Sequence, residues 1–415
     1  MGNTPNIRFK GFTEAWEQRK LGEISQITAG GTPSTKELTY WKPKEVPWLA
    51  SGEVHKKYIY DTDEMISEEG LNNSSAKWVE EGSVLIALAG QGKTRGTAAI
   101  TRIPITTNQS IAAIKFNDIL DADYAFHNLD SRYDELRNIS SGDGTRGGLN
   151  KQLLADLTIT FPQICEQRAI GEYFTNLDHL ITLHQQKCAE IKELKKYMLQ
   201  NMFPQKDEKV PKIRFAGFTG DWKQRKLPEF VSFFNGLTYT PDDVEETGTL
   251  VLRSSNVKNG EIVDADNVYV NGKVVTSENV QKGDIIVVVR NGSRALIGKH
   301  AQIKASMPKT VIGAFMSGIR SEHSSFVNAL LDTSAFENEI AKNMGATINQ
   351  ITGYMFSKME FMIPSGEEQQ QIGECFQRLD NLITLHQQKC AALKEFKKYM
   401  LQNMFPQKGE NKCQN

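Results

Sequence analysis

The stretch LDHLITLHQQKCAEIKELKKYMLQNMFPQK, residues 177–206, returns almost unchanged as LDNLITLHQQKCAALKEFKKYMLQNMFPQK, residues 379–408. The two copies differ at four positions. A second block, IRFKGFTEAWEQRKL at 7–21, returns as IRFAGFTGDWKQRKL at 213–227. Because this period is far too long for a solenoid, the chain is two half-molecules, each a variable segment followed by a constant one.

The constant segment is predicted to be a long helix. Apolar or near-apolar residues recur at alternating steps of four and three, which is the pattern of a coiled-coil seam. Prolines stand just before each copy and just after it, as helix start and stop signals require. From Glu166 to Met202 the first helix would be about 55 Å long. The seam residues are Leu177, Ile181, His184, Cys188 and Ile191 in the first copy and Leu379, Ile383, His386, Cys390 and Leu393 in the second.

Two such helices in one chain are expected to pack on each other in antiparallel fashion, which relates the halves by a pseudo-two-fold axis. Packing of each helix on its own domain, or on another chain, is the alternative. His184 and His386 are interpreted as core histidines that fix the helix register rather than as a catalytic pair. Cys188 and Cys390 are interpreted as small core residues.

The fold class predicted for the chain is α+β. Strand-like runs such as SVLIALA (83–89) and DIIVVV (284–289) alternate with Gly/Asn/Ser turns and a few helical stretches. The predicted layout is a strand-rich variable domain at 1–162, a helix segment at 163–206, a second variable domain at 207–364, a second helix segment at 365–408 and a tail at 409–415.

Composition gives weaker constraints. The 415 residues include 49 basic and 50 acidic side chains, so the net charge carries no nucleic-acid signature. No apolar run is long enough to cross a membrane and no leader is evident, which favours a cytoplasmic protein without membrane contact. The five cysteines form no C-x-x-C pair and no H-E-x-x-H is present, so we expect neither a disulfide framework nor a metal site.

Charge placement is more informative than net charge. Residues 82–117 and 285–321 contain no Asp or Glu but several Lys and Arg, and the two windows occupy equivalent places in the two halves. A local basic face on a domain that is otherwise acidic suits an anionic polymer, since Lys and Arg neutralise phosphates. The alternative, charges that merely solvate a strand face, is weakened because the window occurs twice.

Candidate DNA-binding residues lie in these windows and in or next to four other polar stretches. SGEV (51–54) matches SSNV (254–257), and the Gly-rich loops 140–150 and 343–353 end the two domains. Ordinary turn chemistry is the alternative for any one of these loops. The candidates are Ser51, Glu53, Gly92, Lys93, Arg95, Asn108, Gln109, Thr145 and Arg146 in the first half and Arg253, Ser254, Asn256, Arg290, Asn291, Ser293, Arg294, Lys299, Thr347, Asn349 and Gln350 in the second.

The stretch ALAGQGKTRG (87–96) contains Gly-Lys-Thr but has Ala87 where a phosphate-binding loop needs its first glycine. Its counterpart VVVRNGSRALIGK (287–299) keeps glycines and cations without Gly-Lys-Thr. We therefore interpret both as strand-to-strand loops that face DNA. A nucleotide hydrolase built on Lys93 and an adaptor that binds only protein are the two rival hypotheses.

The plan resembles the DNA-specificity (S) subunits of type I restriction–modification systems, the HsdS family. The resemblance extends over the whole chain and includes TAGGTPSTKELTYW (28–41), VPWLASGEV (46–54), TNQSIAAI (107–114) and FPQICEQRAIGEYFTNLD (161–178). It implies that each variable domain is a target-recognition domain for one half of a bipartite, asymmetric DNA site, and that the paired helices set the spacer between the halves.

The same resemblance implies the partners and cofactors. Two modification (methyltransferase) subunits with S-adenosylmethionine and two restriction (translocase/nuclease) subunits with ATP and Mg would carry out adenine methylation or restriction. This chain is then expected to be non-catalytic and to bind no cofactor itself. The absence of an N/D-P-P-Y-type methyltransferase motif agrees, because no Pro-Pro occurs in the sequence.

Overall fold

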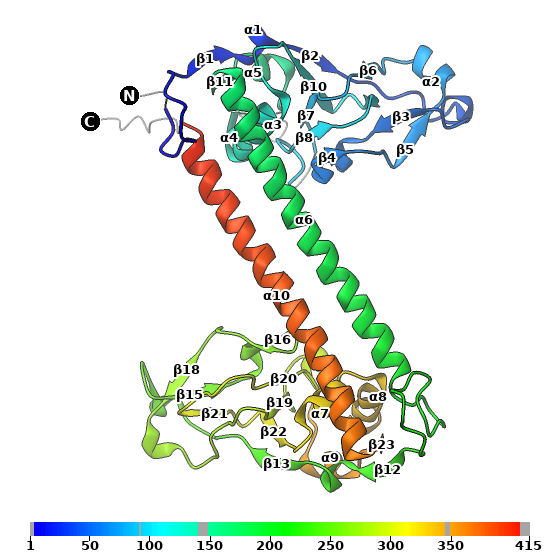
Figure 1. Cartoon of the computed structure of the whole chain (residues 1–415), viewed down its shortest axis with the longest axis vertical. Coiled ribbons are helices and arrows are strands. Elements are labelled where there is room, and N and C mark those ends of the chain that lie inside the picture. The colour runs from blue at the N-terminus through cyan, green and yellow to red at the C-terminus, as the bar shows by residue number, and fades with distance from the viewer. Residues whose placement is uncertain (1–3, 91–92, 140–147, 345–348, 407–415) are drawn as a thin grey trace. The chain divides into compact units, whose positions relative to one another are not determined.

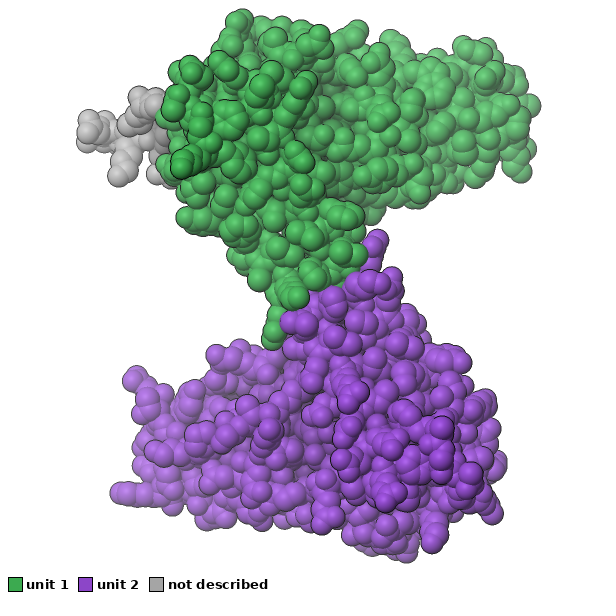
Figure 2. Space-filling model, in the orientation of Figure 1, with its two compact units in different colours: residues 1–184, 388–415 green, residues 185–387 purple. Residues whose placement is uncertain are grey.

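Each half of the chain forms one compact unit together with half of each long helix (Figures 1 and 2). Unit 1 comprises Met1–His184 and Gln388–Asn415, and unit 2 comprises Gln185–Gln387. The structure is a computed structural model that describes residues 4–90, 93–139, 148–344 and 349–406.

Unit 1 contains a five-stranded sheet of order β2-β10-β7-β8-β4, a four-stranded sheet of order β5-β3-β9-β6 and a ribbon of β1 and β11. Its strands are β1 (Glu17–Lys20), β2 (Ser25–Ala29), β3 (Val46–Leu49), β4 (Tyr58–Ile59), β5 (Glu64–Ile66), β6 (Trp78–Val79), β7 (Val84–Ala87), β8 (Ala98–Thr101), β9 (Ile105–Thr107), β10 (Ile111–Phe116) and β11 (Thr158–Phe161). Its helices are α1 (Leu21–Ile24), α2 (Glu68–Asn72), α3 (Ala122–Ser131), α4 (Tyr133–Ile139), α5 (Lys151–Ala155) and the first half of α6 (Ile164–Asn201).

The five-stranded sheet is buried on both faces. Val84 and Ile86 of β7 belong to the core that also contains Phe174 of α6, whereas Leu85 and Ala87 belong to the core on the opposite face. Strands that bury both faces are written as continuous apolar runs rather than alternating ones. This is why the run around β7 is apolar at every position.

Unit 2 repeats this plan with different side chains. It contains sheets of order β13-β22-β19-β20 and β14-β18-β15-β21, and the ribbons β12-β23 and β16-β17. Its strands are β12 (Lys223–Lys226), β13 (Ser232–Asn235), β14 (Val244–Glu245), β15 (Thr249–Leu252), β16 (Val257–Lys258), β17 (Glu261–Ile262), β18 (Val268–Val270), β19 (Ile285–Val288), β20 (His300–Gln302), β21 (Thr310–Ile312), β22 (Met316–Arg320) and β23 (Glu360–Ile363). Its helices are α7 (Ser324–Leu331), α8 (Ser334–Asn343), α9 (Gly353–Lys358) and the first half of α10 (Gly366–Met404), with the second half of α6.

The central strands of the two units share an irregular pairing, although the sheets differ at their edges. β3 pairs with β9 in parallel in unit 1, and β15 pairs with β21 in parallel in unit 2, although most other pairings are antiparallel. In the other large sheet of each unit, the pairs β7–β8 and β19–β20 likewise occupy equivalent places, beside β10 and β22 respectively. The strand-rich α+β class predicted from the sequence is therefore confirmed.

The repeated blocks at 7–21 and 213–227 bind the start of each long helix. The guanidinium of Arg8 donates two hydrogen bonds of 2.7 Å to the Glu166 carboxylate, and Arg214 makes the same contact with Glu368 at 2.7 and 2.8 Å. Both glutamates are 1% exposed. Bidentate Arg–carboxylate pairs fix geometry as well as charge, so the block and the helix are held in one orientation.

Within each unit the two helix halves run antiparallel. In unit 1, Phe174 stacks on Phe405 with ring centroids 5.7 Å apart, and Asp178 lies one turn further along α6 with its carboxylate 2.5 Å from the Lys397 ammonium. In unit 2, Lys195 contacts Asp380 at 2.6 Å. Of the seam residues, Leu177, Ile181, Leu379, Cys188 and Cys390 are buried, while Ile191, Ile383, Leu393 and the two histidines are partly exposed.

Candidate nucleic-acid interface

Three polar segments of unit 2 that are distant in sequence meet at one surface. Arg290 and Gln350 face each other in an isolated antiparallel bridge. The side-chain amide of Asn291 donates to the Ser254 hydroxyl at 3.0 Å, and its main-chain N–H points to the Asn349 carbonyl at 3.4 Å. The residues predicted from the 285–321 window, the SSNV stretch and the Gly-rich loop thus come together.

The loop between β19 and β20 presents cations to solvent. The exposed residues of this loop include Ser293 and the three cations Arg290, Arg294 and Lys299. Among the described residues, none of these three cations forms an ion pair with an acidic side chain. Arg253 differs, because its guanidinium is 2.6 Å from the Asp266 carboxylate. Charges without a protein counterion are available to neutralise phosphates or to bind base edges.

The loops after β7 and β19 are hairpins that are closed in the same way at their base. The N–H of Ala87 bonds to the Thr97 carbonyl at 3.0 Å, and the N–H of Val288 bonds to the Lys299 carbonyl at 2.8 Å. One position before each acceptor stands a glycine in the left-handed region, Gly96 with φ +82° and Gly298 with φ +85°. The predicted equivalence of ALAGQGKTRG and VVVRNGSRALIGK as strand-to-strand loops is therefore visible in the backbone.

This geometry disfavours the nucleotide-hydrolase reading of Gly-Lys-Thr. A phosphate-binding loop leads from a strand into a helix whose first N–H groups hold the phosphates. Here the loop leads from β7 into the antiparallel strand β8. Lys93 is exposed, and its carbonyl accepts a hydrogen bond of 2.9 Å from the Tyr133 hydroxyl of α4. Arg95 is partly exposed, with a buried Nε that has no partner among the described residues.

The other unit 1 candidates lie beside this loop. The N–H of Asn108 bonds to the Leu49 carbonyl at 3.0 Å, so Asn108 follows the end of β9 where β3 also ends, two residues before Ser51. The N–H of Leu88 bonds to the Ser110 carbonyl at 2.8 Å, which joins that edge to the start of the hairpin loop. Gln109 is exposed and accepts a hydrogen bond from the Thr32 hydroxyl.

Two predicted contacts have a structural role instead. Glu53 is 5% exposed, and its carboxylate accepts hydrogen bonds from the N–H of Ala50 at 3.1 Å and the Lys56 ammonium at 2.9 Å. Asn256 is fully buried, and its side chain accepts from the N–H of Arg253 at 2.9 Å. Each residue closes the turn that begins three positions earlier, so neither belongs to the proposed interface. Gly92, Thr145, Arg146 and Thr347 lie outside the described residues.

Sequence reasoning missed Phe315, which is 55% exposed between β21 and β22. Its carbonyl accepts hydrogen bonds from the N–H groups of Val289 at 3.0 Å and Arg290 at 3.2 Å. The guanidinium carbon of Arg290 lies 5.1 Å from the centroid of the Phe315 ring. An alignment of the two halves could have found this residue, because it places Phe315 opposite the polar residue Ser110 of TNQSIAAI, and an aromatic residue at that position stands out.

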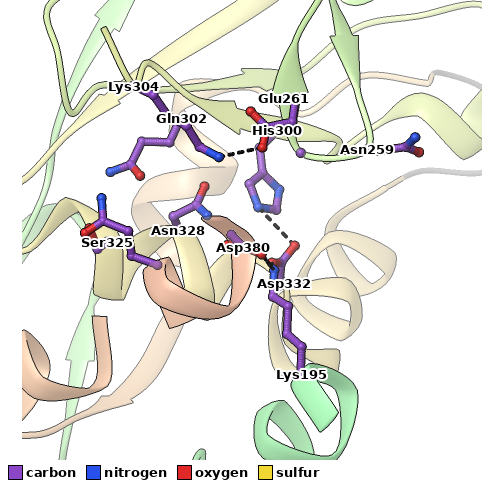
Figure 3. A pocket seen from close by; sticks show the side chains of 12 residues that line it. Lys195, Asn259, Glu261, His300, Gln302, Lys304, Ser325, Asn328, Asp332 and Asp380 are labelled. Carbon is purple, nitrogen blue, oxygen red and sulfur yellow. Dashed lines mark hydrogen bonds and ion pairs between the residues drawn. The ribbon is translucent and has the colours of Figure 1, made fainter. Parts of the chain in front are cut away.

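Half-buried charges join the variable part of unit 2 to the long helices. Lys195 of α6 contacts Asp332 at 2.7 Å and Asp380 of α10 at 2.6 Å, beside a polar cavity of about 90 Å³ (Figure 3). His300 faces Asp332 with Nε2 3.4 Å from the carboxylate, a contact that is electrostatic rather than a well-formed hydrogen bond. Burial opposes ionisation of Asp332, but His300 and Lys195 outweigh it and lower its pKa to about 2.

The equivalent joint in unit 1 has one carboxylate fewer at its lysine. Lys397 contacts Asp178 at 2.5 Å, and the Tyr58 hydroxyl donates to the same carboxylate at 3.0 Å. Asp130 is instead paired with Lys57 at 2.6 Å. Burial lowers the pKa of Lys397 and the nearby Lys57 ammonium lowers it further, so that the carboxylates of Asp178 and Asp130 do not compensate. At Lys195 burial acts in the same direction, but two carboxylates outweigh it and the pKa is raised.

Neither a metal cluster nor a membrane span is found in the part of the chain that the structure describes. No group of three or more His, Cys, Asp or Glu side chains there could hold a metal ion. No described helix has the length and apolar character needed to cross a bilayer.

The fold defines a protein in which one strand-rich scaffold occurs twice, and each copy presents exposed polar loops. The family model for the type I restriction modification DNA specificity domain matches residues 13–193 and 219–395. The chain therefore belongs to this family, the specificity subunits of type I restriction–modification systems, which are non-catalytic. The resemblance noted in the sequence is confirmed.

Individual relatives agree with this assignment. The specificity subunit of the type I restriction enzyme MjaVIII from Methanocaldococcus jannaschii is 22% identical over 410 residues, which cover 94% of this chain and 91% of that protein. The EcoR124I/EcoR124II specificity subunit of Escherichia coli is 27% identical over 166 residues, and the match spans 40% of this chain and about two-fifths (41%) of that protein. The crystal structure of an S subunit from M. genitalium has the same fold, with a TM-score of 0.70 at 14% identity over 98% of this chain and all of that one.

Proposed function

We propose that this chain reads a bipartite, asymmetric site on double-stranded DNA and thereby directs adenine methylation or restriction by partner subunits in the cytoplasm. The domains at 1–162 and 207–364 each read one half-site, and the helix segments at 163–206 and 365–408 set the unread spacer. One observation carries this proposal. The two hairpin loops are closed by the same backbone hydrogen bonds and by a glycine at the same place, but they differ in length and in nearly every side chain, as expected if one scaffold reads two different sequences.

The catalytic chemistry belongs, in this proposal, to other chains. Two modification subunits bring S-adenosylmethionine, and two restriction subunits bring ATP and Mg. This chain binds none of these cofactors. Its part is to position the partners on DNA.

The docking surface that we propose for the modification subunits is duplicated on the long helices. In unit 1 the exposed apolar residues are Leu180, Leu183, Phe396 and Tyr399, and in unit 2 they are Leu194, Tyr197, Leu382 and Leu385. Each is 39–55% exposed, and the two sets are the same repeat positions. Exposed apolar clusters of this kind support protein–protein contact, and two matching clusters support two copies of one partner.

The docking proposal is tested by stoichiometry. We expect Tyr197→Ser to reduce the number of modification subunits in native mass spectrometry from two to one, Tyr399→Ser to do the same, and the double variant to bind none. Lys196→Ser and Lys398→Ser, on exposed neighbouring positions, serve as matched controls and keep two. Retention of both subunits by the double variant would contradict the assignment of this surface.

The proposal that each variable domain reads one DNA half-site is tested by domain exchange. Replacing residues 22–162 with the corresponding domain of another specificity subunit should change one half-site in the methylome and leave the other half-site and the spacer unchanged. Adding whole turns to both helices should lengthen the spacer only. A methylome in which both half-sites change after the domain exchange would refute the model.

The rival hypothesis of an adaptor that binds only protein has a direct test. Fluorescence anisotropy of the chain assembled with its modification subunits should show sequence-specific DNA binding that weakens as salt rises. If the assembled complex has no affinity for DNA, the adaptor hypothesis replaces the proposed function, and an affinity that is equal for all sequences would refute sequence-specific reading.

A further inference from the structure

Arg290 and Phe315 form a preorganised pair on the surface of unit 2. Phe315 is 55% exposed, and its ring lies under the Arg290 guanidinium at 5.1 Å. Both residues are fixed at one backbone junction, because the Phe315 carbonyl accepts the N–H groups of Val289 and Arg290. Arg290 has no acidic partner among the described residues, so the aromatic ring is its main side-chain contact.

The fold does not require this pair. The same junction forms in unit 1, where the N–H of Leu88 bonds to the Ser110 carbonyl at 2.8 Å. There the positions of Arg290 and Phe315 are occupied by Ala89 and Ser110. The backbone junction therefore forms without either side chain. Because the exposed aromatic–arginine pair occurs in the second half and not at the equivalent place in the first, it points to a difference in what the two halves recognise.

The chemistry of the pair favours a base edge over a phosphate. A guanidinium lying on an aromatic ring keeps its N–H donors in one plane and loses little freedom on binding. In the major groove, guanine offers two adjacent acceptors, O6 and N7, that match this planar fork. The neighbouring cations Arg294 and Lys299 extend from the same loop without such support and are suited to phosphates.

We propose that Arg290 reads a guanine in the half-site of the second variable domain, and that Phe315 is the positioning residue that orients its guanidinium. This inference rests on the proposed function, because it names the base that one of the two reading surfaces selects. It also predicts that the half-site of the first variable domain lacks a guanine contact at the equivalent place, where Ala89 and Ser110 stand.

The test uses the full chain assembled with its modification subunits. Relative methylation rates are measured by sequencing on pools of duplexes randomised within both half-sites. Arg290→Lys keeps the charge but loses the bidentate fork. We expect it to reduce the preference for guanine at one position by roughly 5- to 150-fold, and to leave the other half-site unchanged.

Phe315 is tested with two substitutions. Phe315→Leu removes the ring, and we expect it to relax the same position by about 2- to 5-fold, the value of an exposed cation–π contact. Phe315→Tyr keeps the ring and should restore the preference. Lys282→Ala, an exposed cation at the opposite end of β19, is the control and should leave the profile unchanged.

The outcomes separate this inference from the proposed function. If Arg290→Lys weakens methylation of all sequences equally, Arg290 contacts phosphate and the inference is wrong. An unchanged profile for Phe315→Leu would remove Phe315 from the reading pair. If the unsubstituted complex shows no sequence preference at all, the proposed function itself fails.

Discussion

Replacing Lys195 by methionine should destabilise unit 2 much more strongly than replacing a neighbouring lysine. The Lys195 ammonium lies 2.7 Å from an Asp332 oxygen and 2.6 Å from an Asp380 oxygen. The two carboxylate oxygens therefore cannot be farther apart than the sum of these distances, about 5.3 Å. Methionine fills a similar volume but leaves two carboxylates facing each other without the cation between them.

The magnitude follows from this geometry. Two like charges about 5 Å apart repel by about 3 kcal/mol at an effective dielectric constant of about 20. Breaking a buried ion pair by removing one partner costs about 3–5 kcal/mol. Because the three side chains are 17–29% exposed, solvent screens part of this cost, and we expect Lys195→Met to lower the free energy of unfolding of unit 2 by about 2–4 kcal/mol near pH 7, or its melting temperature by roughly 4–16 °C.

Acid should reduce this deficit. In the variant, repulsion raises the carboxylate pKa above its ordinary value, so one aspartate takes up a proton as the pH falls and the repulsion disappears. In the wild type, Asp332 keeps its charge at pH 4 because its pKa is about 2, whereas burial raises the pKa of Asp380 above its ordinary value. The difference in stability between wild type and variant should therefore be smaller at pH 4 than at pH 7.

The measurement is urea unfolding of the full chain followed by hydrogen exchange and mass spectrometry. Peptides from 185–387 report on unit 2, and peptides from unit 1 are the internal reference. Lys196→Met is the matched control, since Lys196 is the exposed neighbour on the same helix. A loss below about 1 kcal/mol for Lys195→Met, or a deficit that is equal at pH 4 and pH 7, would refute the reasoning.

Three further outcomes are expected. Gly298→Ala should destabilise unit 2 by about 2–4 kcal/mol in urea unfolding, because its φ is +85° and the new Cβ would lie 2.5 Å from the Ile340 side chain. The control is Gly292→Ala, whose new Cβ meets nothing within 4 Å and which should be within about 1 kcal/mol of wild type. Asp332→Asn should make the free energy of unfolding less sensitive to acid. The Asp332 carboxyl has a pKa of about 2 in the folded state against an ordinary 3.8, so it contributes stability that is present above about pH 4 and lost as the pH falls towards 2. Asparagine does not titrate, so the variant lacks this pH-dependent contribution. Lys299→Ala should weaken DNA binding by the assembled complex about equally for all sequences and reduce the slope of log affinity against log salt by about 1, whereas a change in sequence preference would contradict a phosphate contact.

The long helices and the strand-rich class were predictable from the sequence because their signals are local. The four–three spacing and the flanking prolines predicted a helix from Glu166 to Met202, and α6 runs from Ile164 to Asn201. Apolar runs predicted β7 and β19. The parallel pairings β3–β9 and β15–β21 were not predictable, since they join strands about 60 residues apart and depend on the complete packed core.

The candidate site was predictable in part, for a physical reason that differs from residue to residue. Arg290 stood out because charge without nearby acid is visible in the sequence. Phe315 did not, because an apolar residue in a basic window looks like core until its 55% exposure is known. Glu53 and Asn256 were assigned to DNA because their stretches match between the halves, but the match reflects a turn that both halves build with a buried side chain.

Identical residues in the two helix copies acquire different properties from the domains packed against them. Lys195 and Lys397 occupy the same repeat position, yet the pKa of Lys195 is raised and that of Lys397 is lowered. The difference comes from the variable segments, because Asp332 turns to the helix lysine whereas Asp130 is paired with Lys57 of its own domain. The lysine and the aspartate that it contacts on the other helix are the same in both repeats, so a domain exchanged between such chains must itself supply the polar groups that pack against this Lys–Asp pair. A domain that offers neither an acid to the lysine nor a hydrogen-bond donor to its aspartate would leave the Lys–Asp pair incompletely satisfied, and we expect the resulting chain to fold less stably even where the loops proposed to read DNA are intact.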